Sequence, residues 1–349
     1  MTNTDNNTYF AAANSCDGFV SFFDKVFSPH NLSHLYIIKG GSGTGKSRLM
    51  RVVSQEALKR GEEVEEFLCS SDPKSLDGVI LKERKIAIID GTSPHTAEPA
   101  FPGAFDEIIN LGEFWESSVL SKNRGEIEKL ITQKKEHYRR AYAYLSLAGG
   151  LCRVRDEILL PYVKTTKLSN FANRFAKRFE KSDGDCDIRL IEGISANGQT
   201  RLNSFYNKAK EHCFIRDKNG ISHIVFSALE RAFYENNIPC SISFDPLDTR
   251  KINALYLKNS QTSIELSDGD KNGDIIINTD RFFEREAFGI ERSNARVSYK
   301  NAGKMCEFAV GELTVAKTLH EKVESIYVSA MNFEKKEEYT KKLIKKVFA

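Results

Sequence analysis

The chain has 349 residues, a length that suggests two domains. Its composition, 40% hydrophobic and 28% charged, is ordinary for a globular protein, and a formal net charge of +3 with lysines spread among glutamates indicates no nucleic-acid surface. No apolar run approaches the roughly 18 residues that span a bilayer, and the polar start lacks a signal-peptide core. We therefore expect a cytoplasmic protein without a membrane partner.

Seven cysteines are present, and no two of them form a C-x-x-C pair. This spacing favours neither a zinc site nor a disulfide framework. We expect reduced thiols, several of them acting as small buried hydrophobic side chains.

The first predicted elements are a short strand at residues 9–13 and a helix capped by Asp17, with phenylalanines on its inner side and Pro29 at its end. Residues 34–39 are typical of a short buried strand. Residues 47–60 are typical of a helix with apolar residues on one side, and a glycine follows where that helix should end.

The stretch between this strand and this helix fits the phosphate-binding loop pattern G-x-x-x-x-G-K-[ST] at every specified position. Glycines let successive backbone amides point at a β-phosphate, and the following helix adds the positive end of its dipole. Lys46 would neutralise the β- and γ-phosphates, and the Ser47 hydroxyl would bind magnesium. The alternative is a glycine-rich turn before an ordinary helix. The predicted ATP- and Mg²⁺-binding residues are Gly40, Gly41, Ser42, Gly43, Thr44, Gly45, Lys46 and Ser47.

Two further strands are predicted at residues 64–69 and 85–90, the second ending at Asp90. An apolar strand that ends in Asp is where phosphate-loop proteins place the carboxylate that holds magnesium beside the loop hydroxyl. Asp90 is therefore the predicted partner of Ser47 at the metal, and a predicted catalytic residue with Lys46. No Glu follows Asp90, so the water-activating carboxylate of many motor-type ATPases is missing there.

His95 follows five residues after this strand, at the edge of the sheet where α/β proteins bind ligands. We expect it to position a water or to touch the γ-phosphate, which would make it the third catalytic candidate. A loop histidine bonded to a nearby carbonyl remains an open alternative.

A long polar helix is predicted over residues 117–147. Four arginines lie on it or after it, and any of them could reach a transferring phosphoryl group, although a solvated helix face also accounts for them. They are Arg139, Arg140, Arg153 and Arg155.

Self-similarity predicts that the second half repeats the first. Residues 189–202 align with the loop strand, the loop and the start of its helix, and Asp245-Pro246 aligns with Asp72-Pro73. Residues 313–326 align with 145–158. Within the loop the aligned pairs are Gly193 with Gly40, Gly198 with Gly45, Gln199 with Lys46, and Thr200 with Ser47. The second loop therefore loses its lysine and looks degraded.

The predicted fold is α/β, with two phosphate-loop NTPase-type units of three α/β/α layers, mainly parallel sheets and long helical extensions. The first domain covers residues 1–165 with the intact loop, and the second covers residues 166–349 with the degenerate repeat.

Several segments together resemble a family of uncharacterised bacterial tandem P-loop ATPase-like proteins. The resemblance covers nearly the whole chain and implies this fold and nucleotide binding, while the family has no established reaction. Its members typically carry two intact loops, and this chain departs from them at Gln199. The segments that carry it are 14–19, 40–47, 69–73, 76–80, 90–95, 102–103, 316–321 and 331–334.

The sequence leaves three functions open. The first is Mg²⁺-dependent ATP hydrolysis or phosphoryl transfer, the second a nucleotide-sensing module with negligible turnover, and the third a small-molecule kinase. ATP is expected rather than GTP, because no Asn-Lys-x-Asp guanine-reading run occurs. No protein partner is indicated.

Overall fold

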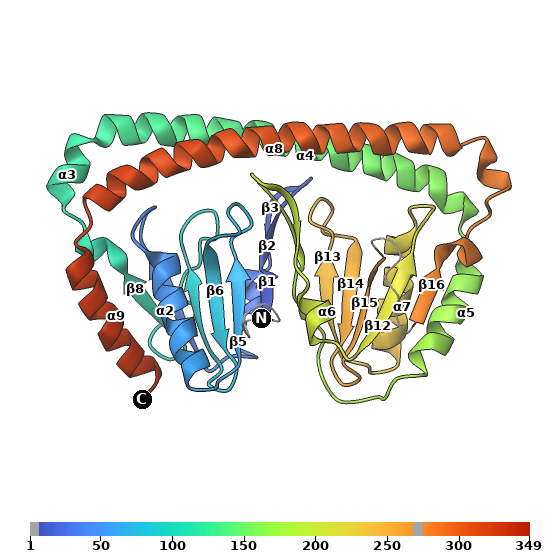
Figure 1. Cartoon of the computed structure of the whole chain (residues 1–349), viewed down its shortest axis with the longest axis horizontal. Helices are drawn as coiled ribbons and strands as arrows, with labels where there is room; N and C mark the ends of the chain where they lie inside the picture. Colours follow the sequence, from blue (N-terminus) through green and yellow to red (C-terminus); the bar gives the residue numbers. More distant parts are fainter. Residues whose placement is uncertain (1–6, 268–274) are drawn as a thin grey trace.

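The computed structural model describes residues 7–267 and 275–349 of the chain. Two α/β units lie side by side, and a pair of long helices runs along both of them (Figure 1). The strands of the first sheet are β1 (Thr8–Phe10), β4 (His34–Lys39), β5 (Val64–Leu68), β6 (Leu76–Leu81), β7 (Ile86–Asp90) and β8 (Asp106–Asn110). Those of the second are β9 (Asp187–Ile188), β12 (Glu211–Arg216), β13 (Cys240–Phe244), β14 (Ile252–Leu257), β15 (Thr262–Leu266) and β16 (Ile275–Asn278).

Two hairpins, nine α-helices and four short 3₁₀ helices complete the described elements. The hairpins are β2 (Ala12–Ser15) with β3 (Gly18–Ser21), and β10 (Glu192–Ser195) with β11 (Gly198–Arg201). The helices are α1 (Phe23–Val26), α2 (Lys46–Lys59), α3 (Ser117–Lys122), α4 (Arg124–Leu159), α5 (Thr165–Ala176), α6 (Ser204–Lys208), α7 (Ser222–Glu235), α8 (Arg292–Ser329) and α9 (Phe333–Val347).

The two sheets have the same topology. The first has the strand order β1-β5-β6-β7-β4-β8, and the second, read from its other end, has β9-β13-β14-β15-β12-β16. In both, the third strand of this order runs antiparallel to its two neighbours and the remaining pairs are parallel. The α/β class is therefore as predicted, with mixed sheets whose antiparallel strand was not foreseen.

The core of the first unit follows from the alternation of side chains along β4. Tyr36 and Ile38 face the apolar side of α2, while Leu35 and Ile37 face the other side of the sheet. Buried residues of α2 recur at helical spacing, as the sequence pattern predicted. The opposite face packs against the short helix α1 and against residues of the second unit, so it lacks a layer of long helices.

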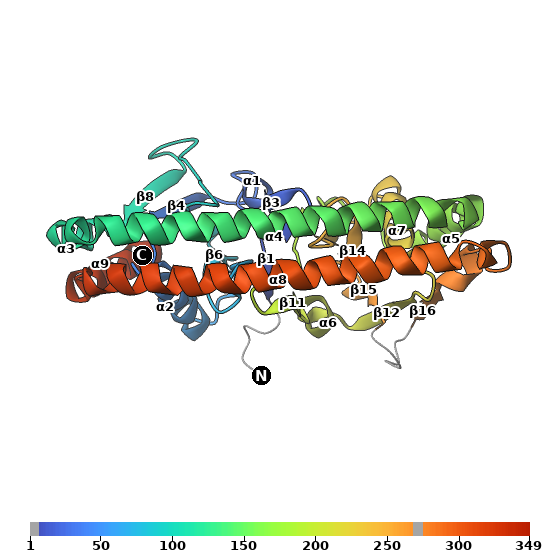
Figure 2. The same ribbon diagram turned by 90° about the horizontal axis from the view of Figure 1, so that it is seen from above.

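Helices α4 and α8 connect the units in opposite directions. They have 36 and 38 residues and lie side by side along their length (Figure 2). Their small buried residues, such as Ala148 and Ala309, allow close packing. Helix α4 leads to α5, which packs against α7 of the second unit, whereas α8 leads back to α9, which packs against α2 of the first. The predicted division at residue 165 thus separates the two sheets, but the last helix of the chain lies with the first.

The predicted residue pairing of the repeat is wrong around the second loop. Residues 193–200 form the β10–β11 hairpin, not a strand-loop-helix. Their counterpart is the β2–β3 hairpin: the Ser15 and Ser195 hydroxyls both contact the glycine carbonyl three residues on. The G-x₄-G spacing of Gly193 and Gly198 imitated a phosphate loop.

Strand and helix order corrects the other pairings. Strand β12, the following residues 217–221 and helix α7 stand where β4, the glycine-rich loop and α2 stand in the first unit. Asp72 matches Asp248, since each carbonyl accepts the amide of the third residue after it, Ser75 and Lys251. The predicted match of residues 145–158 with 313–326 agrees with the positions of α4 and α8.

The prediction of a helix capped by Asp17 is also wrong, because residues 18–21 form strand β3 and α1 begins only at Phe23. None of the helices within residues 7–267 and 275–349 is long and apolar enough to cross a membrane.

Candidate functional site

The glycine-rich loop, residues 40–47, connects β4 to α2, as the sequence predicted. Gly43 and Gly45 have φ angles of 73° and 79°, a left-handed conformation that favours glycine. Helix α2 begins at Lys46, so its unpaired N-terminal amides and the positive end of its dipole lie at the loop.

The structure brings Lys46 and Asp90 together. Strands β4 and β7 are parallel neighbours with Ile38 opposite Asp90, and the Lys46 Nζ lies 3.6 Å from an Asp90 carboxylate oxygen. The same Nζ donates to the carbonyls of Gly40 and Gly41 at 2.9 and 2.8 Å. The other Asp90 oxygen accepts the Thr92 amide and hydroxyl at 2.9 and 2.6 Å.

Burial raises the pKa of Asp90, and Lys46 and Thr92 only partly oppose it. A cation at this carboxylate would lower that pKa again, because it would favour the charged form. Ser47, the other predicted metal ligand, accepts the Leu76 amide at 3.0 Å, which anchors the start of α2 to β6. Its hydroxyl proton and second lone pair stay available.

His95 lies in a buried aromatic pocket. Its Nε2 is 2.9 Å from an Asp77 carboxylate oxygen, and its ring stacks on Phe23 and meets Phe19 edge-on. Its Nδ1 is buried with no hydrogen-bond partner among the described residues. The partner is thus a carboxylate, not the carbonyl of the alternative interpretation. A group of three possible metal-binding side chains, Cys69, Asp77 and His95, has its ligand atoms within 4.8 Å of one another.

Basic side chains from α4, α8 and α9 lie near the loop, and no pattern in the sequence indicates this. The Lys134 Nζ on α4 lies 3.3 Å from the His320 Nδ1 on α8. Burial, then Lys134 and Lys46, lower the pKa of His320 to about 4, and burial also lowers the pKa of Lys134. Lys336 of α9 is 2% exposed with a lowered pKa, and its Nζ would be 3.1 Å from a Cβ at Gly45.

A basic cluster near the loop consists of Lys46, Lys134, His320 and Lys336. Apart from the 3.6 Å contact of Lys46 with Asp90, the described residues offer its members no ion pair. The carboxylates of Asp72 and Glu337 oppose the lowered pKa values of His320 and Lys336, respectively, but burial outweighs them. Burial lowers the pKa values of Lys134, His320 and Lys336, and a nearby anion would reverse these shifts. The cluster is therefore suited to a ligand carrying several negative charges.

The last turns of α8 pack directly on the loop. A Cβ at Gly43 would lie 2.8 Å from the Glu324 carbonyl oxygen and 2.9 Å from a Val328 methyl. A Cβ at Gly41 would meet Tyr327 and Trp115 at 3.2 and 3.3 Å. A movement of this loop would therefore displace the last turns of α8.

The four arginines lie elsewhere. Arg139 and Arg140 pair with Glu136 on the exposed surface of α4, and Arg153 contacts Cys16. Arg155 lies against the second unit, where its guanidinium covers the Tyr299 ring at 4.6 Å.

The loop of the second unit differs in chemistry. The Asp217 carboxylate accepts the amides of Asn219, Gly220 and Ser222 at 3.1, 2.8 and 2.6 Å. Ser222 begins α7 where Lys46 begins α2, and Leu266 lies opposite Ile215 where Asp90 lies opposite Ile38. Gln199, the predicted counterpart of Lys46, instead donates to Glu192 within the hairpin.

Comparison of the chain with protein-family models, with curated proteins and with solved structures finds no match.

Proposed function

We propose that the first unit binds ATP with Mg²⁺ at residues 40–47 and catalyses ATP hydrolysis or phosphoryl transfer. The observation that carries this is the approach of Lys46 to Asp90 at 3.6 Å, at the end of two parallel strands and the start of α2. No described side chain accepts hydrogen bonds from the backbone amides of residues 40–46, so these donors suit phosphate oxygens.

The roles follow from the contacts. Lys46 would exchange the carbonyls of Gly40 and Gly41 for the β- and γ-phosphates, gaining charge-assisted bonds. Ser47 and Asp90 would hold Mg²⁺, Ser47 through its hydroxyl and Asp90 directly or through water. Lys134 and His320 would meet charge on the outer phosphate.

His95 takes a supporting role in this proposal. Its contacts with Asp77 and Phe23 fix it beside the carboxyl end of the sheet, and Asp77 contributes to the raised pKa of Asp90. His95 would therefore set the environment of Asp90 and not touch the γ-phosphate as the sequence suggested.

Nucleotide sensing is a second candidate function, and the contact of α8 with the loop favours it. Phosphates that rearrange Gly41 and Gly43 would press on Tyr327 and Glu324, and α8 continues to the second unit. In that case binding itself would be the signal and turnover would be negligible.

Phosphate release from ATP and Mg²⁺ tests the enzymatic proposal. Wild type should release phosphate, Lys46→Ala should reduce the rate at least about 100-fold, and Lys59→Ala, at the exposed end of the same helix, should match wild type. A silent wild type that still binds ATP would favour sensing. Equal turnover by Lys46→Ala would overturn the assignment of the site.

A further inference from the structure

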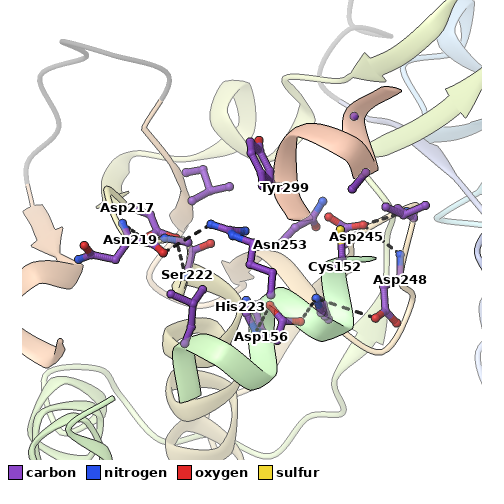
Figure 3. Close-up of a pocket in the computed structure, with 18 of the residues that line it drawn as sticks. Cys152, Asp156, Asp217, Asn219, Ser222, His223, Asp245, Asp248, Asn253 and Tyr299 are labelled. Atoms are coloured by element: carbon purple, nitrogen blue, oxygen red, sulfur yellow. Dashed lines mark hydrogen bonds and ion pairs between the residues drawn. The ribbon is translucent and has the colours of Figure 1, made fainter. Parts of the chain in front are cut away.

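A cavity of about 1290 Å³ lies in the second unit, beneath the long helices. The end of α4, the start of α8, residues 217–223, the β10–β11 hairpin and the turn between β13 and β14 line it (Figure 3). By strand and helix order it occupies the place in this unit that the glycine-rich loop site has in the first. Its size is ample for a nucleotide-sized molecule.

The carboxylates of this cavity already have partners. Asp156 pairs with Lys251 and lies 3.7 Å from His223, Glu192 pairs with Arg201 at 3.0 Å, and Asp248 pairs with Arg250 at 2.6 Å. Asp217 and Asp245 are held by backbone amides. These groups therefore add little free negative charge to the cavity.

Several cations of the lining have no ion pair with any described residue. Lys218 comes from the loop, and Arg292, Arg296 and Lys300 come from the exposed face of α8. Their charge is the unbalanced charge of the cavity and attracts an anion.

Arg155 is built into the same wall. Its Nη2 lies 3.4 Å from the Asn219 carbonyl oxygen, and a Cβ at Gly220 would be 1.5 Å from that nitrogen. Only glycine allows this approach, and Gly220 also has a φ of 82°. The guanidinium also lies over the Tyr299 ring at 4.6 Å, and together these contacts hold its remaining N–H groups at a fixed position.

Besides the cations and Arg155, the buried side chain of Asn253 also indicates a ligand. The residue is 6% exposed and lines the cavity, and neither its Oδ1 nor its Nδ2 has a hydrogen-bond partner among the described residues. A buried amide without partners costs stability, so its retention calls for an explanation. Both atoms are closed to water, so a ligand reaches them when the side chain turns towards the cavity. An amide-like edge of that ligand, such as that of a nucleobase, would then satisfy donor and acceptor together.

We infer that this cavity binds a phosphorylated small molecule with a polar ring, of the nucleotide class, without Mg²⁺. Arg155 and the α8 cations hold the phosphates, and Asn253 contacts the ring. Magnesium is not required, because Leu266 stands in place of Asp90 and His223 in place of Ser47. The loop amides take no part, since they donate to Asp217.

Calorimetric titration of the full chain in EDTA tests this inference with pyrophosphate and with ADP as probes. Lys46→Ala should bind both as wild type does, which separates this cavity from the proposed ATP site. Arg296→Ala, at an exposed position, should weaken both probes roughly tenfold or more. Arg139→Ala, an exposed arginine of α4 away from the cavity, should change neither.

Asn253→Leu separates the two parts of the ligand. It should weaken ADP more than pyrophosphate, and it should raise Tm because it removes unpartnered polar atoms. No binding in EDTA would overturn the inference, as would loss of binding in Lys46→Ala or equal binding by wild type and Arg296→Ala. None of these results bears on phosphate release at the first site.

Discussion

The two units share the same arrangement of strand, loop and helix, but the hydrogen-bond partners of their loop amides differ. At α7 the backbone amides donate to the carboxylate of Asp217 from the same loop. At α2 no described side chain accepts from the loop amides, while Lys46 rests on the carbonyls of Gly40 and Gly41. A helix N-terminus attracts negative charge in either case. One unit supplies that charge internally, and the other is suited to take it from a ligand.

The surrounding helices differ in the same sense. In the first unit α8 packs closely on the loop through the Glu324 carbonyl and the side chains of Tyr327 and Val328, whereas in the second unit α4 meets the loop through the Arg155 side chain. Related topology therefore does not imply a related ligand site. Four changes test this contrast.

The largest effect is expected for Gly43→Ala. It places a Cβ in a left-handed residue and 2.8 Å from the Glu324 carbonyl, so we expect a loss of more than about 3 kcal/mol in unfolding free energy, together with a loss of ATP binding. The matched control is Gly198→Ala, which has a φ of 88° but nothing within 4 Å and should cost only about 1 kcal/mol. Urea unfolding measures both, and equal losses would contradict the close packing of α8 on the loop.

The second effect is a pH dependence from His320. Its pKa is about 4 in the folded protein and near its ordinary value of 6.5 when unfolded. Between these values the unfolded state binds more protons, so stability should fall as the pH is lowered from 6.5 to 4, by up to about 3 kcal/mol. His320→Asn should remove this component from urea unfolding curves at the two pH values. An unchanged difference between them would place the pH dependence elsewhere.

The third change is Asp217→Ala, which removes the internal acceptor of the second loop. We expect a loss of about 2 kcal/mol in unfolding free energy, because three backbone amides lose their partner. Millimolar phosphate should restore part of this loss, since it can accept the same hydrogen bonds. If thermal unfolding shows neither loss nor rescue, the carboxylate does not act as the loop's anion.

The smallest effect on stability is expected for Lys336→Met. It replaces a buried lysine without an ion pair, so the protein should gain up to about 1 kcal/mol, while ATP affinity should fall roughly tenfold. Lys335→Met, its exposed neighbour, should alter neither quantity. Unchanged ATP affinity in Lys336→Met would remove α9 from the proposed site.

The sequence predicted the local parts of this site well. Strand β4, the start of α2 and the strand that ends at Asp90 depend on patterns within a few residues, and the structure has them where they were expected. The approach of Lys46 to Asp90 then follows from parallel pairing of adjacent strands.

The non-local parts could not be predicted. Lys134 and His320 lie 186 positions apart and meet only because α4 and α8 pair along their length. The second loop was missed because Asp217 replaces the glycines that define the motif, while the Gly193–Gly198 spacing of a hairpin imitates them. Helix α9 packs against the first unit, but no pattern in its own sequence indicates which unit it contacts.

The most direct test is a tryptophan fluorescence titration with ATP and Mg²⁺. Trp115 is the only tryptophan of the chain and lies against Gly41, so it reports on the first loop alone. We predict a saturable change in wild type that EDTA weakens and that Lys46→Ala reduces at least about tenfold in affinity. A titration with no change in wild type, or with the same affinity in Lys46→Ala, would contradict the assignment of residues 40–47 as the nucleotide site.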